Sequence, residues 1–339
     1  MGGLSRRYIK VQELKSEGKN PIILDAGDLF FSTTKLNKNN IESEEYRAGA
    51  ILEGYGKIGC DAINVGKYEL LNGLSFLKNM SSKTDIPFLS ANLRDSKTKE
   101  LLFQPYMILT RGDLSFGIIG VTSLLPDTST LVVADEFIQA GNNYIDKVSD
   151  ETDIIIMLIN TDRKSQKDLA ENFSNADFIV TSGSTNLTRT NAPQKEGGPY
   201  MFSCGKQGKY LLTIEANLED PQMSFVNISD HEKKINNVKK RFDRLQKKDP
   251  EKNLEEIYND QANVLKLIDQ YRQDLKLSED AISQARNTIV YKTIGLNKKV
   301  TDDPEILSFV NKSLSQCNAL NRQVKDLKKP KIDHSGHNH

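Results

Sequence analysis

The stretch DAINVGKYELLNG, residues 61–73, places polar side chains directly after a short apolar segment. Residues 62–65 form a brief apolar run of the kind found in buried strands, and Gly66 ends it. Three residues with reactive side chains follow the glycine: Lys67, Tyr68 and Glu69. In open α/β sheets, ligands and catalytic groups gather at the carboxyl ends of the strands. These residues are therefore the first candidates for a functional site.

Strand and helix patterns alternate from residue 4 to about residue 217. Short buried strands are predicted at PIILDAGD (21–28), IPFLSANL (86–93), DIIIMLIN (153–160) and DFIVTSG (177–183). Helical periodicity predicts helices near 4–17, 43–58, 73–80, 134–149 and 165–174. Residues 106–123 are typical of a hairpin turning at Gly112-Asp113, and 201–204 with 209–217 suggest a second hairpin. The fold class is therefore α/β, with largely parallel sheets covered by helices.

The sequence after Pro221 becomes charged and helical. Apolar residues recur there at spacings of three, four and seven: Ile257, Val264, Leu267, Ile268, Tyr271 and Leu275. This pattern predicts an antiparallel helical hairpin over about 231–287, followed by another helix over 303–327. We divide the chain into an α/β domain (1–229), a helical hairpin or stalk module (230–328) and a disordered, histidine-containing tail (329–339). The helical module is expected to bind a protein partner or a second copy of the chain.

Composition excludes several classes of protein. Lys plus Arg and Asp plus Glu both number 46, so no global charge favours nucleic acid or a membrane surface. No run of about 18 apolar residues predicts a membrane-spanning helix. The start, MGGLSRRYIK, lacks the apolar region of a signal peptide. The three cysteines (Cys60, Cys204 and Cys317) have no CxxC spacing, which argues against a zinc ribbon or haem attachment.

Several segments, in order, resemble the catalytic domain of the calcineurin-like metallophosphatases, in the 5′-nucleotidase and UDP-sugar hydrolase branch. They are NPIILDAGDLFFST (20–33), GCDAINVGKYELLNG (59–73), IPFLSANL, FGIIGVTS, TDIIIMLIN and ADFIVTSGST. The resemblance covers roughly residues 2–217 and implies a metallophosphatase-like sandwich. It also implies two metal ions that polarise a phosphoryl group and supply a bound hydroxide. Such a pair needs carboxylate, amide and several imidazole ligands.

The sequence departs from the family pattern at the positions where the family binds metal ions. The chain has four histidines, at 231, 334, 337 and 339, and none in its first 230 residues. By the resemblance, Asp28 corresponds to the metal-bridging carboxylate and is the residual metal candidate. Lys67 occupies the position of the family's asparagine ligand and Tyr68 that of its catalytic histidine, whereas Glu69 matches the glutamate of the motif. The motifs are therefore expected to be degenerate.

Two later motifs and the family's first strand also differ. Asn160 stands where the resemblance implies a histidine, and Gly183 and Thr185 occupy the two histidine positions of the last motif. A shift of one residue brings in Ser184 and Asn186 instead, still without a histidine. The family's first strand, with its Asp-x-His motif, is expected to be missing, because the sequence begins after that position.

Two interpretations of Lys67 remain open. An ammonium group cannot bind a metal ion and repels one. Lys67 therefore either lies near Asp28 and supplies the positive charge that metal ions would supply, or is exposed without a partner. Asp28 itself is either a residual ligand or a turn or cap residue after a strand. Glu69 is either part of the site or a residue that begins a helix.

Three functions follow. The first is a non-catalytic relative, a pseudoenzyme acting as a structural or partner-binding scaffold with no cofactor. The second is a residual metal-dependent phosphohydrolase or 5′-nucleotidase, with divalent metal ions bound by oxygen ligands from Asp28, Glu69 and Asn160. The third is a nucleotide- or anion-binding module using Lys67 and the amides of 181–185.

Location and tail carry further expectations. The family resemblance suggests a periplasmic or extracellular protein. Residues 298–323 resemble a helical segment of 5′-nucleotidase-like proteins fused to multihaem cytochromes, which suggests an exported electron-transfer assembly, although no CxxCH is present. The tail histidines are either ligands for a transition metal ion or part of a plain polar tail: His334, His337 and His339.

Overall fold

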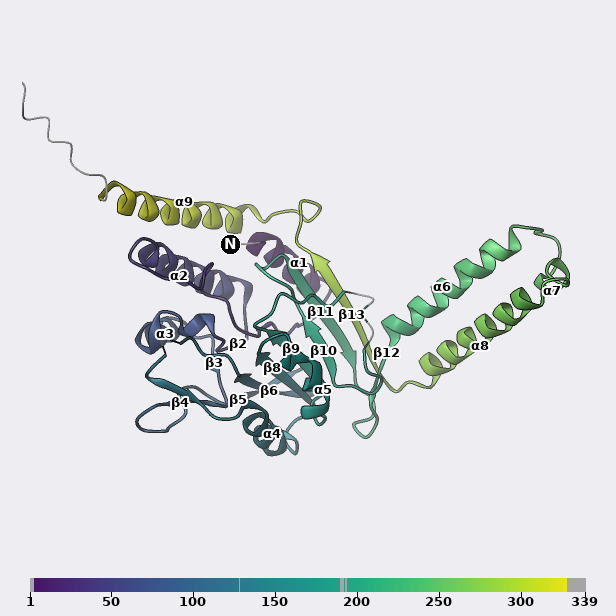
Figure 1. Cartoon of the computed structure of the whole chain (residues 1–339), viewed down its shortest axis with the longest axis horizontal. Helices are drawn as coiled ribbons and strands as arrows, with labels where there is room; N and C mark the ends of the chain where they lie inside the picture. Colours follow the sequence, from purple (N-terminus) through teal and green to yellow (C-terminus); the bar gives the residue numbers. More distant parts are fainter. Residues whose placement is uncertain (1–2, 128, 190–191, 193, 328–339) are drawn as a thin grey trace, which may run out of the picture. The chain divides into compact units, whose positions relative to one another are not determined.

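The computed structural model describes residues 3–127, 129–189, 192 and 194–327 (Figure 1). The chain divides into two compact units. Of the described residues, unit 1 holds those up to Leu187, Met201–Leu211 and those from Gly295 onward, and unit 2 holds those within Thr188–Tyr200 and Leu212–Ile294. Within the described residues, no helix has the length and apolar character needed to cross a membrane.

Unit 1 contains two main β-sheets. The first is parallel, in the order β1 (Leu24–Asp25), β2 (Ala62–Asn64), β3 (Phe88–Leu89). The second runs β10 (Tyr200–Ser203), β9 (Phe178–Ser182), β8 (Ile154–Asn160), β6 (Leu114–Thr122), β5 (Tyr106–Arg111). The predicted hairpin is confirmed, because β5 and β6 pair antiparallel with Arg111 opposite Leu114. The apolar strand β8 is central, as its composition predicted.

The two sheets pack face to face, with helices outside them. Alternate residues of β8 point to opposite faces. Leu158 packs with Ala26, Ala62 and Leu89 of the other sheet, whereas Met157 packs in a cluster with the outer helices. The α/β sandwich expected from the sequence is therefore present.

Helices cover both outer faces of the sandwich. The three-stranded sheet shares a core with α1 (Leu4–Ser16), α2 (Ile41–Ile58), α3 (Gly73–Ser81) and α9 (Pro304–Leu327). The five-stranded sheet is covered by α4 (Phe137–Val148) and the short α5 (Leu169–Asn172). Two 3₁₀ turns, η1 (Tyr68–Leu70) and η2 (Ser165–Asp168), follow strand ends, and β4 (Leu93–Asp95) pairs with β7 (Val132–Ala134).

Unit 2 combines a small sheet with a helical hairpin. Its sheet has the order β11 (Tyr210–Asn217), β13 (Asn287–Gly295), β12 (Phe225–Asn227). The hairpin consists of α6 (Ile228–Gln246) and α8 (Ala262–Gln284), which lie side by side and are joined through α7 (Leu254–Ile257) (Figure 1). Phe242, Leu245 and Ile268 contribute to its apolar seam. The predicted helical hairpin is therefore confirmed.

The structure corrects three expectations. Residues 201–204 and 209–217 do not form a hairpin, because β10 pairs with β9 while β11 belongs to another sheet. Residues 287–295 form a strand that the charged surroundings did not indicate. The predicted helix at 165–174 is only a 3₁₀ turn and one short α-helix.

The two units divide the chain differently from the boundaries drawn on the sequence. The helix α9 belongs to unit 1 and packs along α2, rather than forming one module with the hairpin (Figure 1). Ile306 and Val310 of α9 lie in the core of unit 1, and Ser43 of α2 donates to the carbonyl of Cys317 at 3.1 Å. The sequence missed this because the contacts join segments more than 250 residues apart.

Candidate functional site

Loops at the carboxyl ends of β1, β2 and β8 meet at one edge of the sandwich. The side chain of Asp28 accepts a hydrogen bond from the Tyr68 backbone N–H at 2.9 Å. The Lys67 backbone N–H donates to Asn160 Oδ1 at 3.0 Å, and the Asn160 side chain also hydrogen bonds Asp28. Four of the residues predicted from the sequence are thus brought together, through backbone as well as side-chain contacts.

Glu69 ties two loops together rather than facing solvent. Its side chain is fully buried, and its carboxylate accepts hydrogen bonds from four backbone N–H groups. Asp28 N and Gly66 N donate to one oxygen at 2.9 and 2.8 Å, and Leu29 N and Phe30 N donate to the other at 2.6 and 3.3 Å. Burial, and then the neighbouring Asp28 charge, raises the pKa of Glu69 to about 7. Both oxygens are therefore engaged within the protein.

Asn160 links the ends of three strands. The parallel register places Asn160 level with Thr122 of β6 and with Ser182 of β9. Its Nδ2 donates to Ser182 Oγ at 2.7 Å, and its Oδ1 accepts from Thr122 Oγ1 at 3.1 Å and from the Lys67 N–H. The side chain is fully buried. The amide thus has a partner on each side.

Asp28 is half-buried in a left-handed backbone conformation, with φ of 64°. Burial raises the pKa of its carboxyl, whereas the hydrogen bonds from Tyr68 and Asn160 and the charge of Lys67 lower it. The pKa of Asp28 is raised overall, and the charge of Lys67 is the smallest of these effects, so it gives the pairing hypothesis little support. Among the described residues, no ion pair within 4 Å joins the two.

Backbone geometry explains the glycine at position 183. Gly183 has φ of +82°, and a Cβ atom there would lie 2.5 Å from the carbonyl oxygen of Thr161. A histidine at this position would require the chain to move. Thr185 is exposed and outside the hydrogen-bond network, while Ser184 and Asn186 both donate to Gln166 Oε1 at 3.1 and 2.7 Å. In either alignment the motif supplies no imidazole, and Ser184 and Asn186 are hydrogen bonded within the protein.

A second buried network lies behind the strand edge. Arg7 of α1 donates to the Tyr55 hydroxyl at 2.6 Å, and that hydroxyl donates to Asp25 of β1 at 2.7 Å. Burial raises the pKa of Tyr55 well above its usual value, so the phenol is neutral. This network was not predicted from the sequence, and neither were the roles of Thr122 and Ser182. The last two could have been found, since both are polar residues ending apolar strands beside Asn160.

The predicted tail ligands lie outside the described residues. These are His334, His337 and His339, so their role stays a prediction.

The fold implies a pair of divalent metal ions, and the oxygen donors can be tested for that role. Glu69 is saturated by backbone N–H groups, and Asn160 Oδ1 already accepts two hydrogen bonds. Asp25 accepts from Gly27 N and from the Tyr55 hydroxyl. Across the part of the chain that the structure describes, no cluster of three or more His, Cys, Asp or Glu side chains is arranged to hold a metal ion. The residues present therefore do not fit a two-metal centre.

Relatives of known class share both sequence and fold with this chain. No family model matches. Human 5′-nucleotidase is 26% identical over 242 residues, which are 67% of this chain and 41% of that protein. Protein UshA of Salmonella pullorum is 28% identical over 256 residues, covering 64% and 44%. The calcineurin-like phosphoesterase YfkN of Bacillus subtilis shares the fold, with a TM-score of 0.62, 17% identity and coverage of 95% and 90%.

The chain belongs to the calcineurin-like metallophosphatase superfamily. A 5′-nucleotidase precursor from Thermus thermophilus also has this fold, with a TM-score of 0.56, 20% identity and coverage of 66% and 47%. The chain spans less than half the length of the two curated relatives described above. In this metallophosphatase fold, the polar groups at the strand edge form hydrogen bonds with one another.

Proposed function

We propose that this chain is a non-catalytic member of its superfamily and acts as a structural or partner-binding scaffold. The proposal rests on one observation: the oxygen atoms at the strand edge that could bind a metal ion already accept hydrogen bonds from the protein itself. The side-chain oxygen and nitrogen of Asn160 both form hydrogen bonds within the protein. The Glu69 carboxylate accepts hydrogen bonds from four backbone N–H groups. An oxygen that already accepts two protein hydrogen bonds has to break them before it can bind a metal ion.

Charge at the same edge supports the proposal. Two-metal phosphoester hydrolysis needs dications that stabilise both the attacking and the leaving oxygen. The ammonium of Lys67, which already influences the Asp28 carboxyl, would repel them. No histidine occurs before residue 231 to serve as an imidazole ligand or general acid. We therefore propose that no cofactor is needed for the scaffold role.

The helical hairpin α6–α8 is the proposed partner-binding element. Leu267 and Leu277 of α8 leave 39% and 60% of their surface exposed, although leucine is usually buried. A protein partner or a second copy of the chain would cover such side chains. An exported location follows from the family resemblance, and an association with electron-transfer proteins stays a prediction from residues 298–323.

A metal-dependent phosphohydrolase is the second candidate. It is favoured by the relatives, several of which are 5′-nucleotidases, and by the position of Asp28 beside Asn160 at the strand edge. A nucleotide- or anion-binding module is the third, with Lys67 supplying the charge.

Turnover and binding assays separate these functions. Purified chain is incubated with AMP or UDP-glucose and Mg²⁺, Mn²⁺ or Zn²⁺, and AMP binding is measured by calorimetry. The scaffold proposal expects neither turnover nor binding. Phosphate release that disappears in Asp28→Asn would establish the hydrolase instead. AMP binding without turnover, lost in Lys67→Ala but kept in the exposed control Lys78→Ala, would establish the binding module.

A further inference from the structure

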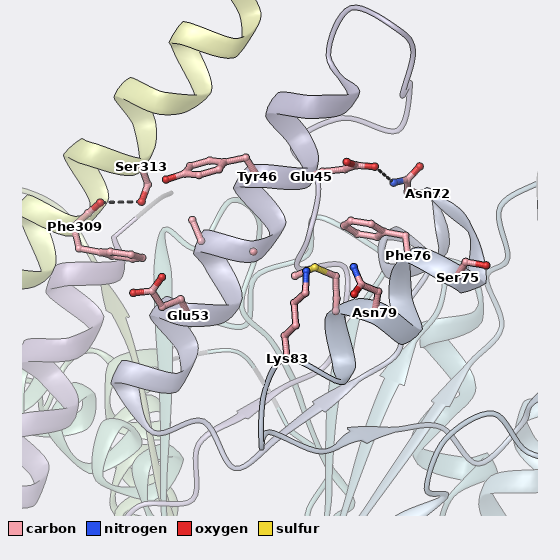
Figure 2. Close-up of a pocket in the computed structure, with 13 residues that line it drawn as sticks. Glu45, Tyr46, Glu53, Asn72, Ser75, Phe76, Asn79, Lys83, Phe309 and Ser313 are labelled. Carbon is pink, nitrogen blue, oxygen red and sulfur yellow. Dashed lines mark hydrogen bonds between the residues drawn. The ribbon is translucent and has the colours of Figure 1, made fainter.

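A groove of about 730 Å³ lies between α2, α3 and α9, built from residues other than those of the strand edge (Figure 2). Its volume falls within the range of small-molecule sites in proteins. Gly49 and Ala50 of α2 are small residues in its lining. The rings of Tyr46, Phe76 and Phe309 also line it, one from each of the three helices.

Two carboxylates of α2 mark the groove's length. Glu45 and Glu53 both line it, and their separation of eight residues corresponds to about 12 Å along the helix. Figure 2 shows Glu45 beside Asn72 and Phe76, and Glu53 beside Phe309. The Asn72 amide donates to Glu45 Oε1 at 2.7 Å, which fixes the orientation of that carboxylate.

One end of the groove already attracts an ammonium group. The Nζ of Lys57 lies 3.5 Å from a Glu53 carboxylate oxygen and 5.4 Å from the centre of the Phe309 ring. A carboxylate together with an aromatic face is a favourable environment for an alkylammonium ion. The contacts of Lys57 therefore show which chemistry this end of the groove favours.

We propose that the groove binds a linear aliphatic polyamine. One ammonium group pairs with Glu45, and a second pairs with Glu53 beside Phe309. The methylene chain between them lies over Gly49 and Ala50, in contact with the aromatic rings. An extended chain of spermidine length spans the two carboxylates, whereas putrescine is too short to reach both.

Among the described lining residues there is a single basic side chain, and replacing it tests whether the ligand is a cation or an anion. Lys83 also lines the groove, and the described part of the chain contains no ion-pair partner for it. If the ligand is a cation, Lys83 opposes binding, and Lys83→Met strengthens it. If the ligand were an anion, the same change would weaken it.

Isothermal titration calorimetry with spermidine tests the proposal on the full chain. We expect one spermidine per chain, with weaker binding of putrescine. Glu45→Gln and Glu53→Gln should each weaken binding by about two- to fivefold, as expected for a partly exposed ion pair. The control Glu42→Gln removes an exposed carboxylate of α2 that does not line the groove, and it should bind as the wild type does. Lys57→Met should bind more tightly, because the internal ammonium no longer competes for Glu53.

Three results would overturn the polyamine site. The first is the absence of saturable binding at low-millimolar spermidine. The second is an equal loss of affinity in Glu42→Gln, which would mean unspecific attraction to an acidic helix. The third is tighter binding of a dianion such as succinate than of spermidine, with a loss of affinity in Lys83→Met. Melting curves of each variant show that it remains folded.

Discussion

Replacing Asn160 by leucine tests whether its amide serves the fold. Leucine has the same number and branching of side-chain heavy atoms, so the change removes hydrogen bonds without leaving a large cavity. The amide of Asn160 connects the end of β8 to Thr122, Ser182, the Lys67 N–H and Asp28. The variant removes all of these contacts at once.

The expected destabilisation follows from the partners left behind. Ser182 Oγ still donates to the carbonyl of Ala26 at 2.6 Å, and Thr122 Oγ1 still has the carbonyl of Leu124 at 3.3 Å. The Lys67 N–H and the Asp28 carboxylate each lose a partner. An unpaired buried polar group costs about 1–3 kcal/mol, so we expect a loss of roughly 3 kcal/mol. For a domain of this size, that lowers the melting temperature by roughly 6–12 °C.

Thermal unfolding followed by far-UV circular dichroism measures the effect. Asn79→Leu is the matched control, because Asn79 is exposed and, in the described residues, its side chain has no hydrogen-bond partner. The control should stay within about 0.5 kcal/mol of the wild type. If Asn160→Leu has the same melting temperature as the control, the amide is not needed for folding and is available for a ligand. That result would contradict the scaffold proposal.

Three further variants and one pH series probe the neighbouring networks. Tyr55→Phe leaves Arg7 and Asp25 without the hydroxyl that joins them, and should lower the unfolding free energy by about 2–4 kcal/mol in urea. Tyr46→Phe, on the exposed side of the same helix, should leave it unchanged. The pKa of Glu69 is raised from 4.5 to about 7, so the folded state holds its proton more tightly than the unfolded state does. This group's contribution to stability should therefore fall as pH rises through this range and level off above it. Glu69→Gln should flatten that part of the melting-temperature profile, and an unchanged slope would assign it to other groups.

Local patterns in the sequence predicted most of unit 1. The apolar run of β8, the turn at Gly112-Asp113 and the period of α2 each depend on neighbouring residues. The strand β13 was missed, since its partners β11 and β12 lie about 60 to 80 residues earlier and its surroundings are charged. Long-range pairing of this kind leaves little local signal.

The candidate site was predicted in position but not in chemistry. The sequence placed Asp28, Lys67 and Asn160 at the carboxyl ends of neighbouring strands, where the structure brings them together. It did not predict that Glu69 would accept backbone N–H groups some forty residues earlier in the chain. The groove between α2 and α9 was also missed, because no local pattern shows that the last helix packs on the second.

Metal content tests most directly whether the strand edge of this chain holds metal ions. The full chain, with His334, His337 and His339 replaced by alanine, is exposed to Mn²⁺ and Zn²⁺, desalted and analysed by mass spectrometry. The alanines remove any contribution from the tail. We expect metal far below one ion per chain, because the strand-edge oxygens that could bind metal already accept hydrogen bonds within the protein. Two tightly held ions per chain, lost in Asp28→Asn, would contradict this expectation.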